Sequence, residues 1–188
     1  MVKIAIFASG NGSNAQRIVE YFSDNSQVAV ECIIYNVKDA YVAERAKALK
    51  IESCFFDRDD FYQNGNVLEY LKKHEIDWIV LAGFLWLVPS DILTDYPHKI
   101  INIHPALLPK YGGKGMYGMH VHEAVIANKE VESGITIHLV DAKYDEGAIL
   151  FQSRCTVTQE DTPATLADKV HALEYRYFPE IIEQVVLA

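Results

Sequence analysis

Residues 2–14 read Val-Lys-Ile-Ala-Ile-Phe-Ala-Ser-Gly-Asn-Gly-Ser-Asn, and this stretch decides the fold class. Its first seven residues form a short apolar run, which is typical of a strand buried inside a sheet. The polar, glycine-rich residues 9–14 then interrupt the run, and residues 15–22 have the pattern of a helix. A strand that turns tightly into a helix is the opening of a βαβ unit.

The same alternation continues through the first half of the chain. Strands alternating with helices predict an α/β fold with a Rossmann-like, open, mostly parallel and twisted sheet that carries helices on both faces. The strands are expected at residues 28–35, 53–56, 78–81 and 100–104, and the helices at 40–49, 67–73 and 91–96.

The second half of the chain has a different pattern. A loop rich in Gly, Pro and Lys, residues 105–119, precedes a helix at 121–128. Two strand-like runs, 134–140 and 149–157, flank an acidic turn, so we expect an antiparallel edge on the sheet. A closing helix begins at Thr162-Pro163, with Thr162 as N-cap, and runs toward Val186. No repeat or linker interrupts the chain, so we expect one domain over 1–188.

Composition excludes several classes of protein. The 188 residues are 50% hydrophobic and 23% charged, as in globular proteins, and 17 basic against 26 acidic residues give a net charge of −9. That charge disfavours binding to nucleic acid or an anionic membrane. The longest apolar run, 78–88, is far shorter than the ~20 residues of a membrane-spanning helix. Three unpaired-looking cysteines and no secretory pattern predict a cytoplasmic protein.

The segment Ser9–Asn14 has the chemistry of an anion site. Glycines allow the backbone to turn tightly and to approach a ligand, and free amides at a helix N-terminus favour phosphate. The segment is not a dinucleotide fingerprint, because position 15 is alanine, and it lacks the Gly-Lys-Ser/Thr of a P-loop. The alternative is a polar turn in which Ser13 or Asn14 merely caps the helix.

A second motif, Asn102-Ile-His104-Pro, ends a predicted strand. Residues two apart on a strand share a face, so Asn102 and His104 project together at the carboxyl end, where α/β sheets bind ligands. Asparagine can donate to a developing oxyanion, and histidine can move a proton near neutral pH. The alternative is a hydrogen-bonded histidine at a strand end. His138, in a strand pattern, is interpreted as a core residue.

The acidic loop Asp141–Gly147 is the third candidate. A carboxylate in it could orient His104 or raise the pKa of that imidazole by stabilising its charged form. The alternative is a solvated hairpin turn, and the spacing does not fit a calcium loop.

Five segments, in this order, resemble the phosphoribosylglycinamide formyltransferases, a family of folate-dependent enzymes of purine synthesis. Together they extend over nearly the whole chain, which makes the ordered set more specific than any single motif. The segments are 9–14 (Ser-Gly-Asn-Gly-Ser-Asn), 81–85 (Leu-Ala-Gly-Phe-Leu), 101–111 (Ile-Asn-Ile-His-Pro-Ala-Leu-Leu-Pro-Lys-Tyr), 138–152, and 171–179.

The resemblance implies formyl transfer from the co-substrate 10-formyltetrahydrofolate to the amine of 5-phosphoribosylglycinamide, with no metal. By this similarity Asn102 stabilises the tetrahedral oxyanion, His104 moves protons or supports the oxyanion, and Asp145 tunes His104. Residues 1–100 would be the half that binds the phosphoribosyl substrate, and residues 101–188 the catalytic and folate-binding half.

The resemblance also implies two sets of binding residues. One set holds the phosphoribosylglycinamide, and the other lines the folate site. In the folate site, residues 85–88 match the segment that lines the pterin pocket, largely through backbone groups. The substrate set is Gly12, Ser13, Asn14 and Glu174, and the folate set is Arg58, Leu85, Trp86, Leu87, Val88 and Asp141.

Two features depart from the family. Residues Gly112–Met119 are longer than the short turn of many relatives, and they are either a glycine-hinged lid with Lys114 near the substrate phosphate or a longer surface loop. His171 stands where some relatives carry a stronger phosphate-binding base.

Other functions were weighed against formyl transfer. Methionyl-tRNA formyltransferase and formyltetrahydrofolate hydrolase share the catalytic core, but each carries an additional domain that we do not expect here. A nonenzymatic nucleotide-binding module is disfavoured by the joint presence of Asn102, His104 and Asp145. A dehydrogenase is disfavoured by the missing third glycine. We expect small-molecule substrates only, with no nucleic acid or membrane partner, and a monomer or homodimer.

Overall fold

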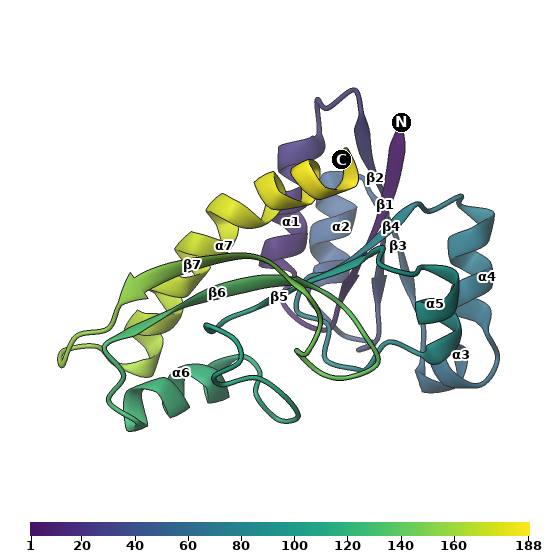
Figure 1. Ribbon diagram of the computed structural model, residues 1–188. Helices are drawn as coiled ribbons and strands as arrows, with labels where there is room; N and C mark the ends of the chain where they lie inside the picture. Colours follow the sequence, from purple (N-terminus) through teal and green to yellow (C-terminus); the bar gives the residue numbers. More distant parts are fainter. The chain divides into compact units, whose positions relative to one another are not determined.

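The computed structural model describes all residues, 1–188, and divides them into two compact units. Unit 1 comprises residues 1–101 and 182–188, and unit 2 comprises residues 102–181. One seven-stranded sheet has the strand order β3-β2-β1-β4-β5-β6-β7 (Figure 1). The expected assignment of one half to the phosphoribosyl substrate and the other to catalysis stays a prediction.

Unit 1 contains the parallel part of the fold. Strand β1 pairs in parallel with β2 on one side and with β4 on the other, and β2 pairs in parallel with β3. The strands are β1 (Val2–Ala8), β2 (Val28–Tyr35), β3 (Glu52–Phe55), β4 (Trp78–Leu81) and the start of β5 (Ile100–His104). The helices are α1 (Ser13–Phe22), α2 (Val42–Leu49), α3 (Arg58–Tyr62), α4 (Asn66–Lys73) and α5 (Ser90–Asp95).

The core of unit 1 forms because apolar residues occupy both faces of the central strand. Ile4, Ile6 and Phe7 of β1 are fully buried. In Figure 1, α1 and α2 lie on one side of strands β1–β4, and α3, α4 and α5 lie on the other. Helix α1 turns its apolar positions, spaced three and four residues apart, toward the sheet. Those buried positions are Ala15, Ile18, Val19 and Phe22.

Unit 2 contains the antiparallel edge and most of the long closing helix. Helix α6 (Met119–Ala127) is followed by β6 (Glu132–Leu139), which pairs antiparallel with β7 (Ile149–Thr156), as expected. Helix α7 (Pro163–Val186) begins at the predicted position. Its N-cap is confirmed, because the Thr165 amide donates to Thr162 Oγ1 at 3.2 Å.

The predicted fold class is confirmed, and most element bounds agree to within two residues. Strands β1, β2, β4 and β5 have the expected limits. Helix α3 was not predicted, because it is only five residues long and is defined by a capping box between Asp57 and Asp60 rather than by an apolar stripe.

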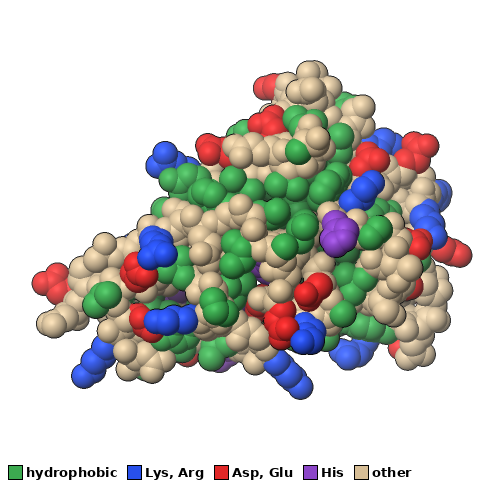
Figure 2. All heavy atoms as spheres, viewed as in Figure 1, with side chains coloured by type: hydrophobic (Ala, Val, Ile, Leu, Met, Phe, Trp, Pro, Cys, Tyr) green, Lys and Arg blue, Asp and Glu red, His purple; other side chains and the backbone are tan.

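The surface carries charged side chains of both signs. In the view of Figure 2, acidic and basic side chains are intermixed and do not form one continuous basic area. None of the helices has both the length and the apolar character that crossing a membrane requires.

Candidate active site

The predicted phosphate loop, Ser9–Asn14, joins β1 to α1 in unit 1, and the N-cap of α1 makes no side-chain cap bond. The N-cap of α1 is Gly12, in a left-handed conformation with φ 77°, and no side-chain cap bond is formed. The interpretation that Ser13 or Asn14 caps the helix is therefore wrong. A glycine N-cap supplies no side-chain acceptor to the first-turn amides of α1, as expected of a helix end that accepts an anion.

Gly12 is required at its position for two reasons. Its positive φ disfavours any residue with a Cβ, and an added Cβ would lie 2.4 Å from Val42 Cγ2. Gly12→Ala is therefore expected to reduce the free energy of unfolding by about 2–4 kcal/mol, through the left-handed conformation and overpacking together. Urea denaturation measures this loss. Gly10→Ala is the matched control, because an added Cβ there meets no atom within 4 Å; equal losses in the two variants would contradict the argument.

The predicted pterin-binding segment, residues 85–88, follows β4 and lies beside the phosphate loop. The Ser9 amide donates to the Gly83 carbonyl at 3.0 Å, and the Leu85 amide donates to Ser9 Oγ at 2.9 Å. Leu85 and Leu87 are exposed, whereas Val88 is buried. Unit 1 therefore brings two predicted ligand-binding segments together, with Val88 packed into the core.

Arg58 and Trp86, both predicted at the folate site, contact each other. The Arg58 guanidinium carbon lies 5.6 Å from the Trp86 ring centre and 5.2 Å from that of Tyr62. Tyr62, which was not predicted, also donates its hydroxyl to the Leu87 carbonyl at 2.6 Å. Trp86 packs against Phe61 with ring centres 5.4 Å apart. The result is an aromatic surface with one cation on it, which is suitable for a flat, anionic heterocyclic ligand.

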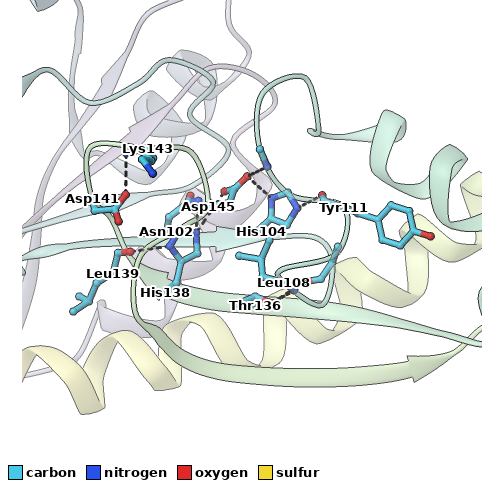
Figure 3. Close-up of polar contacts among 12 residues, drawn as sticks. Asn102, His104, Leu108, Tyr111, Thr136, His138, Leu139, Asp141, Lys143 and Asp145 are labelled. Atoms are coloured by element: carbon cyan, nitrogen blue, oxygen red, sulfur yellow. Dashed lines mark hydrogen bonds and ion pairs between the residues drawn. The ribbon is translucent and has the colours of Figure 1, made fainter.

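The three predicted catalytic residues come together in unit 2 (Figure 3). His104 Nδ1 lies 3.5 Å from Asp145 Oδ2, and His104 Nε2 donates to the Tyr111 carbonyl at 2.7 Å. His104 is only 4% exposed. Both of its ring nitrogens thus face oxygen acceptors, so each N–H group of the charged imidazolium has an acceptor.

His138 joins Asn102 to this cluster, and its role was missed. Its Nδ1 donates to the Leu139 carbonyl at 2.8 Å, which leaves Nε2 to accept from Asn102 Nδ2 at 3.1 Å. The same Nε2 lies 3.6 Å from Asp145 Oδ1. His138 is therefore a network residue as well as a core residue. Its strand pattern indicated only burial, because the pairing that faces it toward Asn102 is a tertiary feature.

The ionisation of the cluster is governed by opposing effects. Burial lowers the pKa of His104 below its ordinary value, and the Asp145 carboxylate and the Tyr111 carbonyl oppose that shift. The pKa of His104 is therefore lowered overall and not raised as expected. Burial raises the pKa of Asp145, but His138, His104 and the Gly113 amide outweigh burial and lower it. Asp145 is therefore an anion at neutral pH.

Two residues that contact His104 have an uncommon backbone. Tyr111 and Asp145 have φ values of 57° and 58°, a region that costs a non-glycine residue about 1–2 kcal/mol. The turn that carries Asp145 closes tightly at Gly147, where a Cβ would lie 1.7 Å from the Leu139 carbonyl oxygen. The Gly113 amide donates at 2.9 Å to Asp145 Oδ2, the same oxygen that faces His104 Nδ1. Strain at such positions is a common property of functional sites.

Two other predicted binding residues, Asp141 and Glu174, lie in the acidic loop and on α7. Asp141 is exposed and accepts from the Lys143 amide within its own turn at 2.9 Å. Glu174, on α7, is buried at 5% exposure. Their ligand contacts stay predictions. His122, on α6, is also buried, and burial together with His171 and His104 lowers its pKa to about 4, so it is neutral.

The arrangement of acidic, histidine and cysteine side chains does not resemble a metal site. No group of three or more of them is placed to hold a metal ion. What the cluster offers is an amide donor, a buried imidazole and a carboxylate, which is the chemistry of proton transfer and oxyanion stabilisation.

Comparison with known proteins identifies the family. The sequence profile described as "Formyl transferase" matches residues 2–182. The chain belongs to the formyl transferase family. This confirms the family prediction that was made from the five sequence segments.

Individual family members are similar over most of the chain. The chloroplastic phosphoribosylglycinamide formyltransferase of Arabidopsis thaliana is 40% identical over 96% of this chain, which spans 64% of that protein's length. The Bacillus subtilis phosphoribosylglycinamide formyltransferase is 36% identical over 99% of this chain and 95% of its own. The Streptococcus pneumoniae TIGR4 crystal structure of that enzyme has a TM-score of 0.87 at 37% identity, with 99% of each chain covered.

Proposed function

We propose that this protein transfers the formyl group of 10-formyltetrahydrofolate to the amine of 5-phosphoribosylglycinamide. The products are N-formylglycinamide ribonucleotide and tetrahydrofolate, in de novo purine synthesis. One observation carries the proposal: in a formyl transferase family chain, Asn102, His138, Asp145 and His104 lie together in one polar cluster. The similar proteins from Arabidopsis and Bacillus are named for this activity.

Asn102 is the proposed oxyanion donor. Its amide nitrogen carries two hydrogens, and the bond to His138 Nε2 uses only one. That bond fixes the orientation of the amide, so the second hydrogen is directed at a defined point. When the substrate amine attacks the formyl carbon, negative charge develops on the formyl oxygen, and a preorganised donor stabilises it most.

His104 is the proposed proton carrier. The new C–N bond forms as the amine attacks, and the bond from the formyl carbon to N10 of the folate then breaks. The amine loses one proton and N10 gains one, so the transfer is balanced without any other reactant. His104 can relay this proton or support the oxyanion as imidazolium, and Asp145 stabilises the charged ring.

The binding segments complete the proposal. Gly12, Ser13 and Asn14 would bind the substrate phosphate through the N-terminus of α1, and Glu174 would contact the glycinamide part. The folate ring would lie against the segment 85–88, with Arg58 and Asp141 as further contacts. The transfer needs no metal ion. We further propose that the protein is cytoplasmic, that it has small-molecule partners only, and that it is a monomer or a homodimer.

Turnover of a 10-formyl folate analogue, followed by absorbance with and without phosphoribosylglycinamide, tests the proposal. Deformylated folate is expected only when the amine is present, with one equivalent of formylated amine formed for each folate released. Release without the amine would identify a hydrolase. No release under either condition would refute the proposal and favour a binding module.

A further inference from the structure

Helix α2 binds two successive carbonyl groups of the phosphate loop. The Val42 amide donates to the Gly10 carbonyl at 3.1 Å, and Arg45 Nε donates to the Asn11 carbonyl at 2.8 Å. Val42 and Arg45 lie three residues apart, on one side of α2, and α2 runs beside α1 in unit 1 (Figure 1). Both carbonyls of the loop therefore point toward α2.

These two hydrogen bonds determine where the amides of the loop point. The peptides that join Gly10, Asn11 and Gly12 are trans, because the single cis peptide of the chain is Leu108–Pro109. In a planar trans peptide the carbonyl and the N–H point in opposite directions. The amides of Asn11 and Gly12 therefore point away from α2. Successive amides that face one side, next to a helix N-terminus, form an anion-binding concavity.

Arg45 donates hydrogen bonds to the loop and to α1 through all three nitrogens of its guanidinium group. Besides the bond to the Asn11 carbonyl, Nη2 donates to Asn11 Oδ1 at 2.6 Å, and Nη1 donates to Gln16 Oε1 on α1. The Tyr41 ring lies 5.1 Å from the guanidinium carbon. The planar guanidinium can hold these acceptors at once, which an ammonium group cannot do. Each of its three nitrogens donates to the loop or to α1, so the structure assigns the side chain to holding the loop.

We infer that Arg45 is a positioning residue that orients the amides of the phosphate loop toward the phosphate of the substrate. The inference rests on the proposed function and deepens it. Helix α2, which carries Arg45, then contributes to the affinity for the substrate. Loss of the guanidinium should weaken binding of the phosphorylated substrate and leave the chemical step intact.

Arg45→Met and Arg45→Lys test the inference by steady-state kinetics. For Arg45→Met we expect KM for phosphoribosylglycinamide to rise about tenfold or more, because a charge-assisted hydrogen-bond network is lost, with kcat and the KM for the formyl folate nearly unchanged. Arg45→Lys should show a smaller rise in this KM, because lysine keeps the positive charge but lacks the planar set of donors of the guanidinium. Glycinamide ribonucleoside, which lacks the phosphate, should react with the same kcat/KM in wild type and variant.

Two further variants serve as controls. Lys47→Met makes the same change in charge on an exposed position of α2 and should leave KM unchanged. Gln16→Met removes the acceptor on α1 without touching a loop carbonyl, so its effect should be smaller than that of Arg45→Met. An unchanged KM in Arg45→Met would overturn the inference. So would a parallel fall in kcat/KM for the ribonucleoside, because that result indicates general damage to the fold.

A thermal shift with inorganic phosphate keeps this test separate from the test of the proposed function. Millimolar phosphate is expected to raise the Tm of the wild type and of Lys47→Met, and to raise the Tm of Arg45→Met by clearly less. A wild type that transfers no formyl group but shows this pattern would refute the function and retain the inference. A phosphate shift that is equal in Arg45→Met, or that is absent from the wild type, would overturn the inference.

Discussion

His104→Ala is expected to lower kcat for formyl transfer by about 10²- to 10⁴-fold, the usual contribution of a positioned acid or base. The KM values for both substrates should change by less than about threefold. The reason is that His104 is buried, and its two ring nitrogens are committed to Asp145 and to the Tyr111 carbonyl. The protein therefore holds the ring, and its loss removes the proposed proton carrier without removing contacts to the bulk of either substrate.

The measurement is steady-state kinetics at saturating formyl folate, accompanied by urea denaturation to confirm that the variant is folded. His104→Asn provides a second variant with a smaller loss of volume and the same expected loss of kcat. His120→Ala is the matched control, because that imidazole is exposed, on α6, and contacts Glu123 at 3.6 Å and the Tyr117 ring, away from the cluster's hydrogen bonds. A folded His104→Ala enzyme with raised KM and normal kcat would contradict the catalytic role.

Asp145→Asn is the second variant with a large expected effect. Asp145 Oδ2 faces His104 Nδ1 at 3.5 Å, and Oδ1 faces His138 Nε2 at 3.6 Å. Asparagine keeps the size and can still accept from the Gly113 amide, but it removes the charge that stabilises the imidazolium. We expect kcat to fall by about 10²-fold or more, as happens when a carboxylate that orients a catalytic histidine is neutralised.

The same variant should shift the pH profile in a defined direction. Burial lowers the pKa of His104, and the Asp145 carboxylate opposes that shift. Without the carboxylate, burial acts with less opposition, so the pKa of His104 falls further. The ionisation of His104 in the pH dependence of kcat should therefore move to lower pH. If the imidazolium is the active form, activity is lost on the alkaline side earlier than in the wild type.

A pH profile of kcat from pH 5 to 10 measures this shift. Glu146→Gln is the control, because it neutralises an exposed carboxylate of the same loop that pairs with Lys143 instead. Its profile should match that of the wild type. A normal kcat in Asp145→Asn, or an ionisation displaced to higher pH, would show that Asp145 does not tune His104.

Local patterns were sufficient for most of the fold. The apolar run 2–8 forms a strand because side chains on both of its faces can be buried in a sheet that is covered on both sides. The apolar character of the residues themselves indicates this. The same holds for the start of α7, where Thr162 and Pro163 satisfy local requirements of a helix end. Helix α3 escaped prediction because a single turn has too few residues to show a period.

The sequence by itself determined which chemical groups the site contains: an amide at 102, an imidazole at 104, a carboxylate at 145, and a glycine-rich turn at 9–14. Their types, order and spacing along the chain were enough to indicate the family. The tertiary structure alone decided which groups meet. His138 orients Asn102, and Arg45 holds Asn11, from positions distant in sequence. Strand register and helix packing bring these groups together, and local residue patterns do not encode the partners. Burial, which is equally a property of the whole fold, decided that the pKa of His104 falls where its acidic neighbour alone would raise it.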